Sequence, residues 1–191
     1  MSDQNEPIDE NYVDAVNAFR EEKDQFFADS PQSPIPHEDR HGHFSGLNYY
    51  PPDPAFQVVA EVVPFESPSV VQMATSTGDI RPQVRYADLR FRLGDQDLHL
   101  VGFTNPDEGE PEELFVPFRD ATSSHETYGA GRYLEVEVEY HDDGSETAVV
   151  DFNLAYNPYC AYSPYYSCPI PPAENTLPVA IMAGERNYGD H

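Results

Sequence analysis

A polar stretch between two apolar segments contains residue types that could bind or transform a small molecule. Arg119 and Arg132 lie at its two ends, and Glu126 and Tyr128 lie between them. Two guanidinium groups would bind an anionic group, Glu126 would serve as a general acid or base, and Tyr128 would contact the ligand. The alternative is an internal clamp, in which Arg119 pairs with Asp120 or Glu126 and the stretch only connects two strands.

A second group of polar residues lies at the end of an apolar segment. Asp151 and Asn153 would point to the same side of a strand, and Asn157 would follow at its end. Because buried polar groups are hydrogen-bonded, an inward-facing pair would meet either a ligand or backbone groups of the next loop. In the first case Asp151 is a second candidate for acid–base catalysis, and Asn153 and Asn157 contact the ligand. In the second case all three side chains are structural.

The segment Asp151–Asn175 is rich in proline and tyrosine and contains both cysteines of the chain. Proline disfavours helices and inner strands, and this many aromatic residues are expected to be buried. We therefore expect an ordered loop packed across the mouth of the fold. Cys160 and Cys168 leave three interpretations open: buried reduced thiols, a disulfide that closes the loop, or a metal-binding or nucleophilic role. Two cysteines alone do not form a zinc site, which needs four ligands.

The histidines near residue 40 formally match a zinc-peptidase motif. His37, Glu38 and His41 have the HExxH spacing, in which two histidines one helical turn apart bind zinc and the glutamate acts as a base. Such enzymes need a long helix with an apolar side, whereas Gly42 and Gly46 leave room for only about two turns. We therefore expect a short, solvated turn or helix here and no metal site.

The chain is strongly acidic. Its 191 residues include 35 aspartates and glutamates against 10 lysines and arginines, which gives a net charge of −25, and Lys23 is the only lysine. Such a chain repels itself in dilute salt, whereas at about 1 M salt the Debye length falls to about 3 Å. The acidic residues are spread over the whole chain, which is typical of a halophilic protein rather than of a domain with an acidic tail.

Composition also limits the location and the partners. No basic stripe is present that would bind nucleic acid. No apolar run approaches the about 20 residues of a membrane helix, and the acidic first residues are unlike a signal peptide. We expect a cytoplasmic protein with an acidic disordered tail at 1–10 and a single domain at 11–187. The sequence indicates neither a cofactor nor an oligomeric state.

Local patterns predict one helix followed by about eight strands. Residues 11–29 carry an apolar side made of Tyr12, Val16, Phe19 and Phe26. From residue 56 onward, alternating and β-branched segments predict a mainly β fold, either a single antiparallel β-barrel or a barrel-like sandwich, with the helix packed on it. The predicted strands are 56–63, 69–74, 84–93, 98–104, 114–118, 132–141, 148–156 and 179–183.

Several longer motifs resemble the family called domain of unknown function 1684 (DUF1684). The resemblance covers about residues 15–186 and rests on KDQFF (23–27), GLNYYP (46–51), FVPFRDAT (115–122), ETYGAGRYL (126–134) and residues 151–175. It implies a bacterial or archaeal protein without an established activity and, together with the acidic composition, a haloarchaeal member. The family motifs include the candidate site residues named above, but they do not include His37 or His41.

The sequence therefore supports two functional hypotheses. In the first, a small anionic molecule binds at the barrel mouth, with or without catalysis, and seven motif residues form the site. In the second, the protein is a non-catalytic structural or interaction module whose motif residues brace the loop that ends at Asn175. The seven residues are Glu126 and Asp151 as catalytic candidates, and Arg119, Arg132, Tyr128, Asn153 and Asn157 as ligand contacts.

Overall fold

Alternating apolar and polar residues form the strands of the fold. In β5 (Arg132–Tyr140), Leu134, Val136 and Val138 are buried while the glutamates between them are exposed, as expected where one face of a sheet covers a core. Five further strands complete the sheet of this computed structural model, which describes residues 10–189. They are β1 (Gln57–Ala74), β2 (Ile80–Leu93), β3 (Gln96–Thr104), β4 (Glu113–Phe118) and β6 (Glu146–Asp151).

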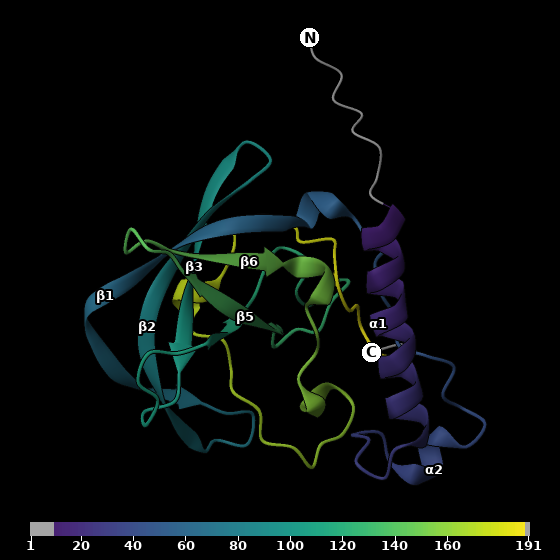
Figure 1. Ribbon diagram of the computed structural model, residues 1–191. Coiled ribbons are helices and arrows are strands. Elements are labelled where there is room, and N and C mark those ends of the chain that lie inside the picture. Colours follow the sequence, from purple (N-terminus) through teal and green to yellow (C-terminus); the bar gives the residue numbers. More distant parts are fainter. Residues whose placement is uncertain (1–9, 190–191) are drawn as a thin grey trace.

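The six strands close into an antiparallel barrel in chain order (Figure 1). Closure is made by β6, which pairs with the first part of β1 from Gln57 opposite Asp151 to Glu61 opposite Thr147. The predicted barrel with an N-terminal helix is therefore confirmed, and of the two predicted β architectures the closed barrel is the one present.

Apolar side chains from all six strands fill the barrel. Leu89, Leu100 and Leu134 are among the most deeply buried of them. Leu177 and Ile181 join the same core from the C-terminal segment, although that segment contains no strand of the barrel. The barrel is therefore a packed core and not a pore, as is usual for small barrels.

The predicted number of about eight strands is wrong. The segments 56–63 and 69–74 belong to one strand, β1, because a shift in pairing register between Pro64 and Ser69 accommodates the prolines. The strand predicted at 148–156 ends at Asp151, where the 3-10 helix η2 (Phe152–Leu154) begins. Residues 179–183 form no strand, and hydrogen bonds to the barrel hold them instead.

α1 (Glu10–Asp29) confirms the predicted helix, but its buried side differs from the predicted one. Val16, Arg20 and Phe27 are buried, whereas Phe19 and Phe26 are 48% and 38% exposed. The predicted apolar side is therefore rotated partly out of the protein.

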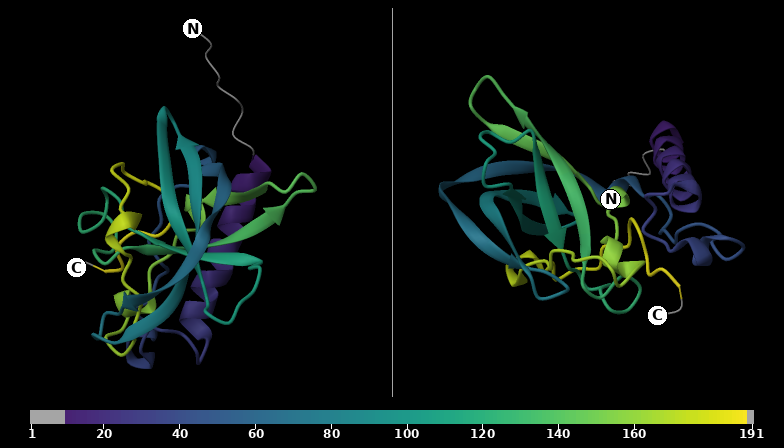
Figure 2. Two further views of the ribbon diagram at one scale, coloured as in Figure 1. Left: turned by 90° about the vertical axis from the view of Figure 1, so that its left-hand side faces the viewer. Right: turned by 90° about the horizontal axis from the view of Figure 1, so that it is seen from below.

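Polar contacts attach α1 to the connecting segments and thereby set its rotation. Arg20 donates to the backbone oxygens of Tyr50 at 2.7 Å and Asn153 at 3.3 Å. Lys23 Nζ lies 2.5 Å from Glu185 Oε1. Figures 1 and 2 show α1 standing beside the barrel, with these connecting segments in between.

Four short helices complete the secondary structure: α2 (His37–Arg40), η1 (Pro54–Phe56), η3 (Tyr159–Ala161) and η4 (Ala173–Asn175). The tail predicted at 1–10 lies outside the described residues, apart from Glu10, which begins α1. Within residues 10–189, no helix has both the length and the apolar character needed to cross a membrane.

Candidate functional site

Arg132 is buried at the start of β5 and holds the C-terminal segment against the barrel. Its Nη1 donates to the backbone oxygens of Ala183 and Glu185, and its Nη2 donates to that of Ile181 at 2.9 Å. Asp120 Oδ2 lies 3.6 Å from Nη2 and balances the charge. Burial lowers the pKa of the Arg132 guanidinium, and the carboxylate of Asp120 opposes that shift.

Asp120 completes this contact from the end of β4. Its Oδ2 accepts from the backbone N–H of Ile181 at 2.5 Å, and Thr122 Oγ1 donates to both of its carboxylate oxygens at 2.9 and 3.0 Å. We refer to Arg132 and Asp120 as the clamp. The sequence suggested an internal clamp with Arg119, but the structure places Arg132 in that position.

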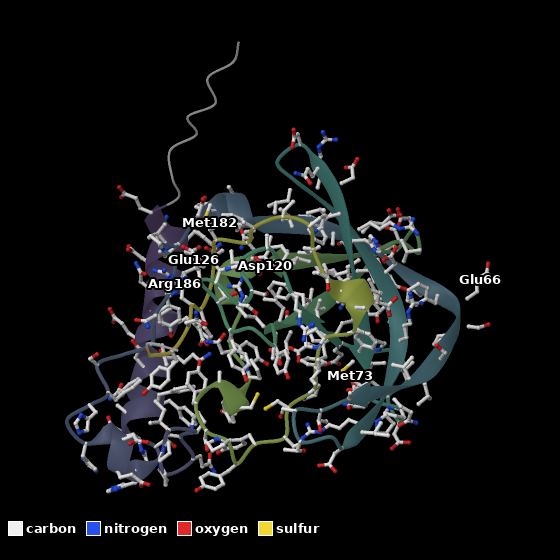
Figure 3. All side chains as sticks on the ribbon, turned by 180° about the vertical axis from the view of Figure 1, so that it is seen from behind. Glu66, Met73, Asp120, Glu126, Met182 and Arg186 are labelled. Atoms are coloured by element: carbon white, nitrogen blue, oxygen red, sulfur yellow. The ribbon has the colours of Figure 1, made fainter. Side chains whose placement is uncertain are left out.

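Arg119 and Glu126 lie outside the clamp. Arg119 Nε donates weakly to the backbone oxygen of Ala130 at 3.4 Å. Glu126 is exposed; it accepts from the Tyr50 hydroxyl at 2.8 Å, and its other oxygen lies 3.9 Å from Arg186 Nη2 (Figure 3). Burial, together with the hydrogen bond to Glu126, raises the pKa of Tyr50 to about 12. Glu126 therefore belongs to a surface network.

Asp151 and Asn153 form a second network between the end of β6 and α1. The Tyr12 hydroxyl donates to Asp151 Oδ1 at 2.9 Å, and the same oxygen accepts from the Asn153 N–H at 3.0 Å. The Asn153 side chain accepts from the Asp53 N–H at 2.9 Å and donates to the Asp53 oxygen at 2.8 Å. Burial, and then the charge of Asp151, raise the pKa of Tyr12. The network ties the first turn of α1 to the barrel.

Asn157 belongs to a third network, which is centred on Glu185. The buried Glu185 carboxylate accepts from the Asn157 N–H at 2.7 Å and from the Tyr162 hydroxyl at 2.5 Å, while Lys23 lies against its other oxygen. Asn157 Nδ2 donates to the backbone oxygen of Arg186 at 2.9 Å. Sequence reasoning missed Glu185, because nothing in its neighbourhood along the chain marks it as buried.

The structure thus distributes the seven predicted site residues over several networks. None of them lines the apolar hollow beside α1. Their role as ligand or catalytic residues stays a prediction.

A groove of about 660 Å³, with aromatic residues as half of its lining, lies between α1, the loop after β6 and the sheet. We refer to it as the aromatic groove. The sequence did not reveal it, because its walls come from segments far apart in the chain. Phe19 and Phe26, which the sequence placed on the apolar side of the helix, line it instead of the core. The aromatic lining consists of Phe19, Phe26 and Phe27 from α1, Tyr133 from β5, and Tyr156, Tyr159 and Tyr166 from the loop.

The aromatic groove also contains three charged residues, Glu22, Lys23 and Arg81. Lys23 Nζ lies 4.8 Å from the centroid of the Tyr156 ring, and Glu185 neutralises its charge. Arg81 Nη2 donates to the backbone oxygen of Ser167 at 2.7 Å. In the part of the chain that the structure describes, Arg81 forms no ion pair.

A smaller and more polar cavity of about 350 Å³ adjoins the aromatic groove. Arg81 and Tyr156 line both hollows, whereas Glu108, Glu113 and Glu135 line only the smaller one. Arg81 therefore lies between an apolar surface and an acidic one.

Both cysteines are free thiols of the loop after β6, and Cys168 lines the aromatic groove. The backbone N–H of Cys160 donates to Cys168 Sγ at 3.3 Å, and the Tyr128 hydroxyl lies 3.5 Å from Cys160 Sγ. Burial raises the pKa of the Cys168 thiol to about 11. Tyr128, one of the seven predicted site residues, thus contacts a cysteine.

The HExxH spacing falls on a very short helix, as the sequence predicted. α2 has four residues and ends at Arg40. His37, its first residue, and His41, which follows its end, are exposed and place their Nε2 atoms 2.9 Å apart. Over residues 10–189, no group of three or more histidine, cysteine, aspartate or glutamate side chains is arranged to hold a metal ion.

We expect that His37 and His41 do not hold zinc stoichiometrically, because two imidazoles supply half of the ligands of a structural zinc site. Elemental analysis after exhaustive dialysis measures this directly. His99→Ala, which removes an exposed histidine elsewhere, is the matched control for His41→Ala. One zinc per chain in the wild type and His99→Ala, but not in His41→Ala, would contradict the prediction.

Comparisons with known proteins identify the family but not an activity. The model of a family described as "Protein of unknown function (DUF1684)" matches residues 42–186. The solution NMR structure of an uncharacterised protein of Haloarcula marismortui is 41% identical in sequence, with a TM-score of 0.72, over 95% of this chain and 97% of that one. The comparison with curated proteins gave no match. The match confirms the resemblance seen in the sequence, and the chain belongs to the DUF1684 family of proteins of unknown function.

Proposed function

We propose that the protein binds a small, mostly apolar molecule with one anionic group in the aromatic groove. The observation that carries the proposal is an open hollow of about 660 Å³ with aromatic walls on a chain that is otherwise rich in charge. Small-molecule sites usually have volumes of about 300–1,000 Å³ and are lined mainly by apolar and aromatic side chains. This proposal keeps the anionic ligand of the sequence hypothesis. It moves the binding site from the barrel mouth to the groove beside α1.

The tyrosines of the aromatic groove are held in place by the protein. The Tyr133 hydroxyl donates to a backbone oxygen of the loop, and the Tyr156 hydroxyl donates to Glu135. Tyr159 packs edge-on against Tyr166, with ring centroids 5.2 Å apart. Binding to a wall whose side chains are already ordered costs little conformational entropy. The groove therefore favours a ligand with a flat apolar or aromatic body.

Arg81 is the residue that would bind the anionic group. It is exposed and uses one donor on the Ser167 backbone, so its guanidinium retains donors for a ligand. Lys23 is less available, because it pairs with Glu185 at 2.5 Å. The acidic cavity beyond Arg81 would repel a second anionic group, which favours ligands with a single negative charge.

Most of the seven residues predicted from the sequence would have supporting roles in this proposal. The clamp holds the C-terminal segment, and Asp151 and Asn153 hold α1, which forms one wall of the groove. Asn157 helps to hold Glu185, which pairs with the lysine of the groove. Acid–base catalysis by Glu126 or Asp151 forms no part of the proposal.

Anilinonaphthalene sulfonate, a flat apolar anion, is a suitable probe in molar KCl. Fluorescence titration should show one saturable site per chain. Arg81→Gln should weaken binding by about threefold to fivefold, which corresponds to about 1 kcal/mol for a partly exposed charge contact. Binding of phenylnaphthylamine, a neutral analogue, should not change in that variant, because the apolar walls remain.

Two further variants make the experiment specific to the groove. Tyr166→Ala removes part of the wall and should weaken both probes. Arg92→Gln removes an exposed arginine outside the groove and should weaken neither. Equal affinities of Arg81→Gln and Arg92→Gln for the anionic probe, or several weak sites in place of one, would contradict the proposal.

The second candidate function is a non-catalytic structural or interaction module. The observation that favours it is that the clamp and Asp151 bond groups of the protein itself. If neither probe binds saturably to the folded protein, this candidate replaces the first.

A further inference from the structure

We propose that Cys160 and Cys168 form a redox site, which interconverts between a dithiol and an intramolecular disulfide by exchange with low-molecular-weight disulfides. They are the two cysteines of the chain, and both are free thiols in the structure. The inference does not depend on the ligand proposed for the aromatic groove.

The backbone holds the two thiols next to each other. The N–H of Cys160 donates to Cys168 Sγ at 3.3 Å. Because the N–Cα bond is about 1.46 Å long, Cys168 Sγ lies within about 4.8 Å of Cys160 Cα. The two side chains also interact directly, since, besides burial, a side-chain hydrogen bond to Cys160 is among the causes that shift the pKa of Cys168. Rotation of the Cys160 side chain would therefore bring the two sulfur atoms together without a large movement of the loop.

Cys168 is the more firmly held of the two residues. Its N–H donates to Ser76 Oγ at 3.0 Å, and its backbone oxygen accepts from the Ser76 N–H at 2.9 Å, so the turn between β1 and β2 fixes it. It is 8% exposed, and burial raises the pKa of its thiol. A buried thiol with a raised pKa reacts slowly with reagents from solvent. Cys168 would therefore react second, with the sulfur of Cys160 rather than with the small disulfide.

Cys160 is the accessible member of the pair. It lies in η3 and is partly exposed. The Tyr128 hydroxyl lies 3.5 Å from its sulfur and can donate a hydrogen bond to the thiolate. Cys160 is therefore the thiol that would react first with a small disulfide.

The reaction consists of two exchange steps. The Cys160 thiolate attacks a disulfide R–S–S–R, which forms a mixed disulfide on Cys160 and releases one R–S⁻. Cys168 then loses its proton, attacks Cys160 Sγ and releases the second R–S⁻. The protein gives up two electrons, the small disulfide is reduced to two thiols, and the protons of the two cysteines end on those thiols.

The disulfide would change the wall of the aromatic groove. Tyr159 precedes Cys160, Tyr166 and Ser167 precede Cys168, and all three of these neighbours line the groove. A bond between the cysteines would fix the two ends of this wall to each other. The redox site is thus placed where its state would alter the shape of the aromatic groove.

Exchange with oxidised glutathione tests the proposal on the full chain in molar KCl. After quenching with an alkylating reagent, intact mass should show that the wild type has lost two hydrogen atoms and carries neither glutathione nor alkyl groups. Cys168→Ala should retain one glutathionyl group on Cys160, because the second step is blocked. Cys160→Ala should be modified at least tenfold more slowly than Cys168→Ala, because Cys168 is buried.

Several results would overturn the proposal: unmodified wild-type thiols, two glutathionyl groups per chain, or disulfide-linked dimers. Equal rates in the two single variants would overturn the assigned order of the steps. Circular dichroism establishes that each variant is folded, and Cys168→Ser replaces Cys168→Ala if the latter does not fold.

A second experiment tests the folded geometry. The equilibrium constant for disulfide formation should be at least tenfold larger in the native protein than in guanidinium chloride. If the equilibrium constant for disulfide formation in the native protein were less than ten times its value in guanidinium chloride, the proposal would be refuted.

Discussion

Arg132→Met should lower the free energy of unfolding by about 3–5 kcal/mol, the usual cost of removing one partner from a buried ion pair. The Arg132 and Asp120 side chains are 1% and 0% exposed. Without the guanidinium, the backbone oxygens of Ile181, Ala183 and Glu185 lose a donor, and Asp120 is left as a buried charge. The C-terminal segment, which supplies part of the barrel core, should then detach more easily.

Thermal unfolding in molar KCl measures this effect. For a chain of this size, about 3–5 kcal/mol corresponds to a decrease in Tm of roughly 10 °C. Arg132→Lys should lie in between, because an ammonium group keeps the charge but cannot donate in the fork geometry of a guanidinium. Arg92→Met is the control: Arg92 is 64% exposed and lies 3.7 Å from Asp97, so its loss should matter little. If Arg132→Met were no less stable than Arg92→Met, the clamp would not support the fold.

Removing salt should lower the Tm by more than any single substitution proposed above, and it should unfold much of the protein near room temperature. The reason is the net charge of −25. The Debye length grows from about 3 Å in 1 M salt to about 30 Å in 0.01 M salt, so acidic residues across the whole surface begin to repel one another. Calorimetry or circular dichroism over a KCl series is the measurement. A Tm that is the same in molar and millimolar KCl would refute the halophilic interpretation.

One acidic row on the barrel allows a sharper version of this test. Glu113 of β4 lies directly opposite Glu137 of β5, and Glu135 is close by. Burial, and then these neighbouring charges, raise the pKa of Glu113 above its usual value of 4.5. Ionisation of Glu113 therefore opposes folding. The free energy of unfolding should decrease as pH rises through the pKa of Glu113 in the folded protein, and it should recover as pH falls towards 4.5.

A double variant isolates the contribution of this acidic row. Glu113→Gln with Glu137→Gln should raise the Tm in dilute salt, because it removes the repulsion between opposite strand positions. In molar KCl the same variant should differ little from the wild type, because salt already screens the two charges. An equal effect at both salt concentrations would show that the change acts through packing and not through charge.

The sequence by itself determined the class of the fold, because strands such as β5 show locally which of their side chains face the core. Leu134, Val136 and Val138 alternate with glutamates whatever the partner strand is, so β5 could be predicted from the chain alone. Prolines misled the prediction where β1 continues through Pro64, since the register shift that accommodates them depends on the pairing with β2. α1 shows the same division. Its two ends were predicted almost to the residue, but the side of the helix that is buried was not.

The composition likewise determined the acidic character on which the salt prediction rests, and long motifs determined the family. None of this required knowledge of which residues touch.

Only the tertiary structure decided what the polar motif residues contact. Arg132 bonds backbone oxygens about 50 positions further along the chain, and Glu185 meets Lys23 from the other end of the protein. The aromatic groove is also a tertiary feature, because α1, the loop after β6 and Arg81 form it only once they are docked together. The physical reason is that periodicity reports whether a side chain faces the core, whereas the partner of a buried charge and the shape of a surface hollow depend on how distant segments pack.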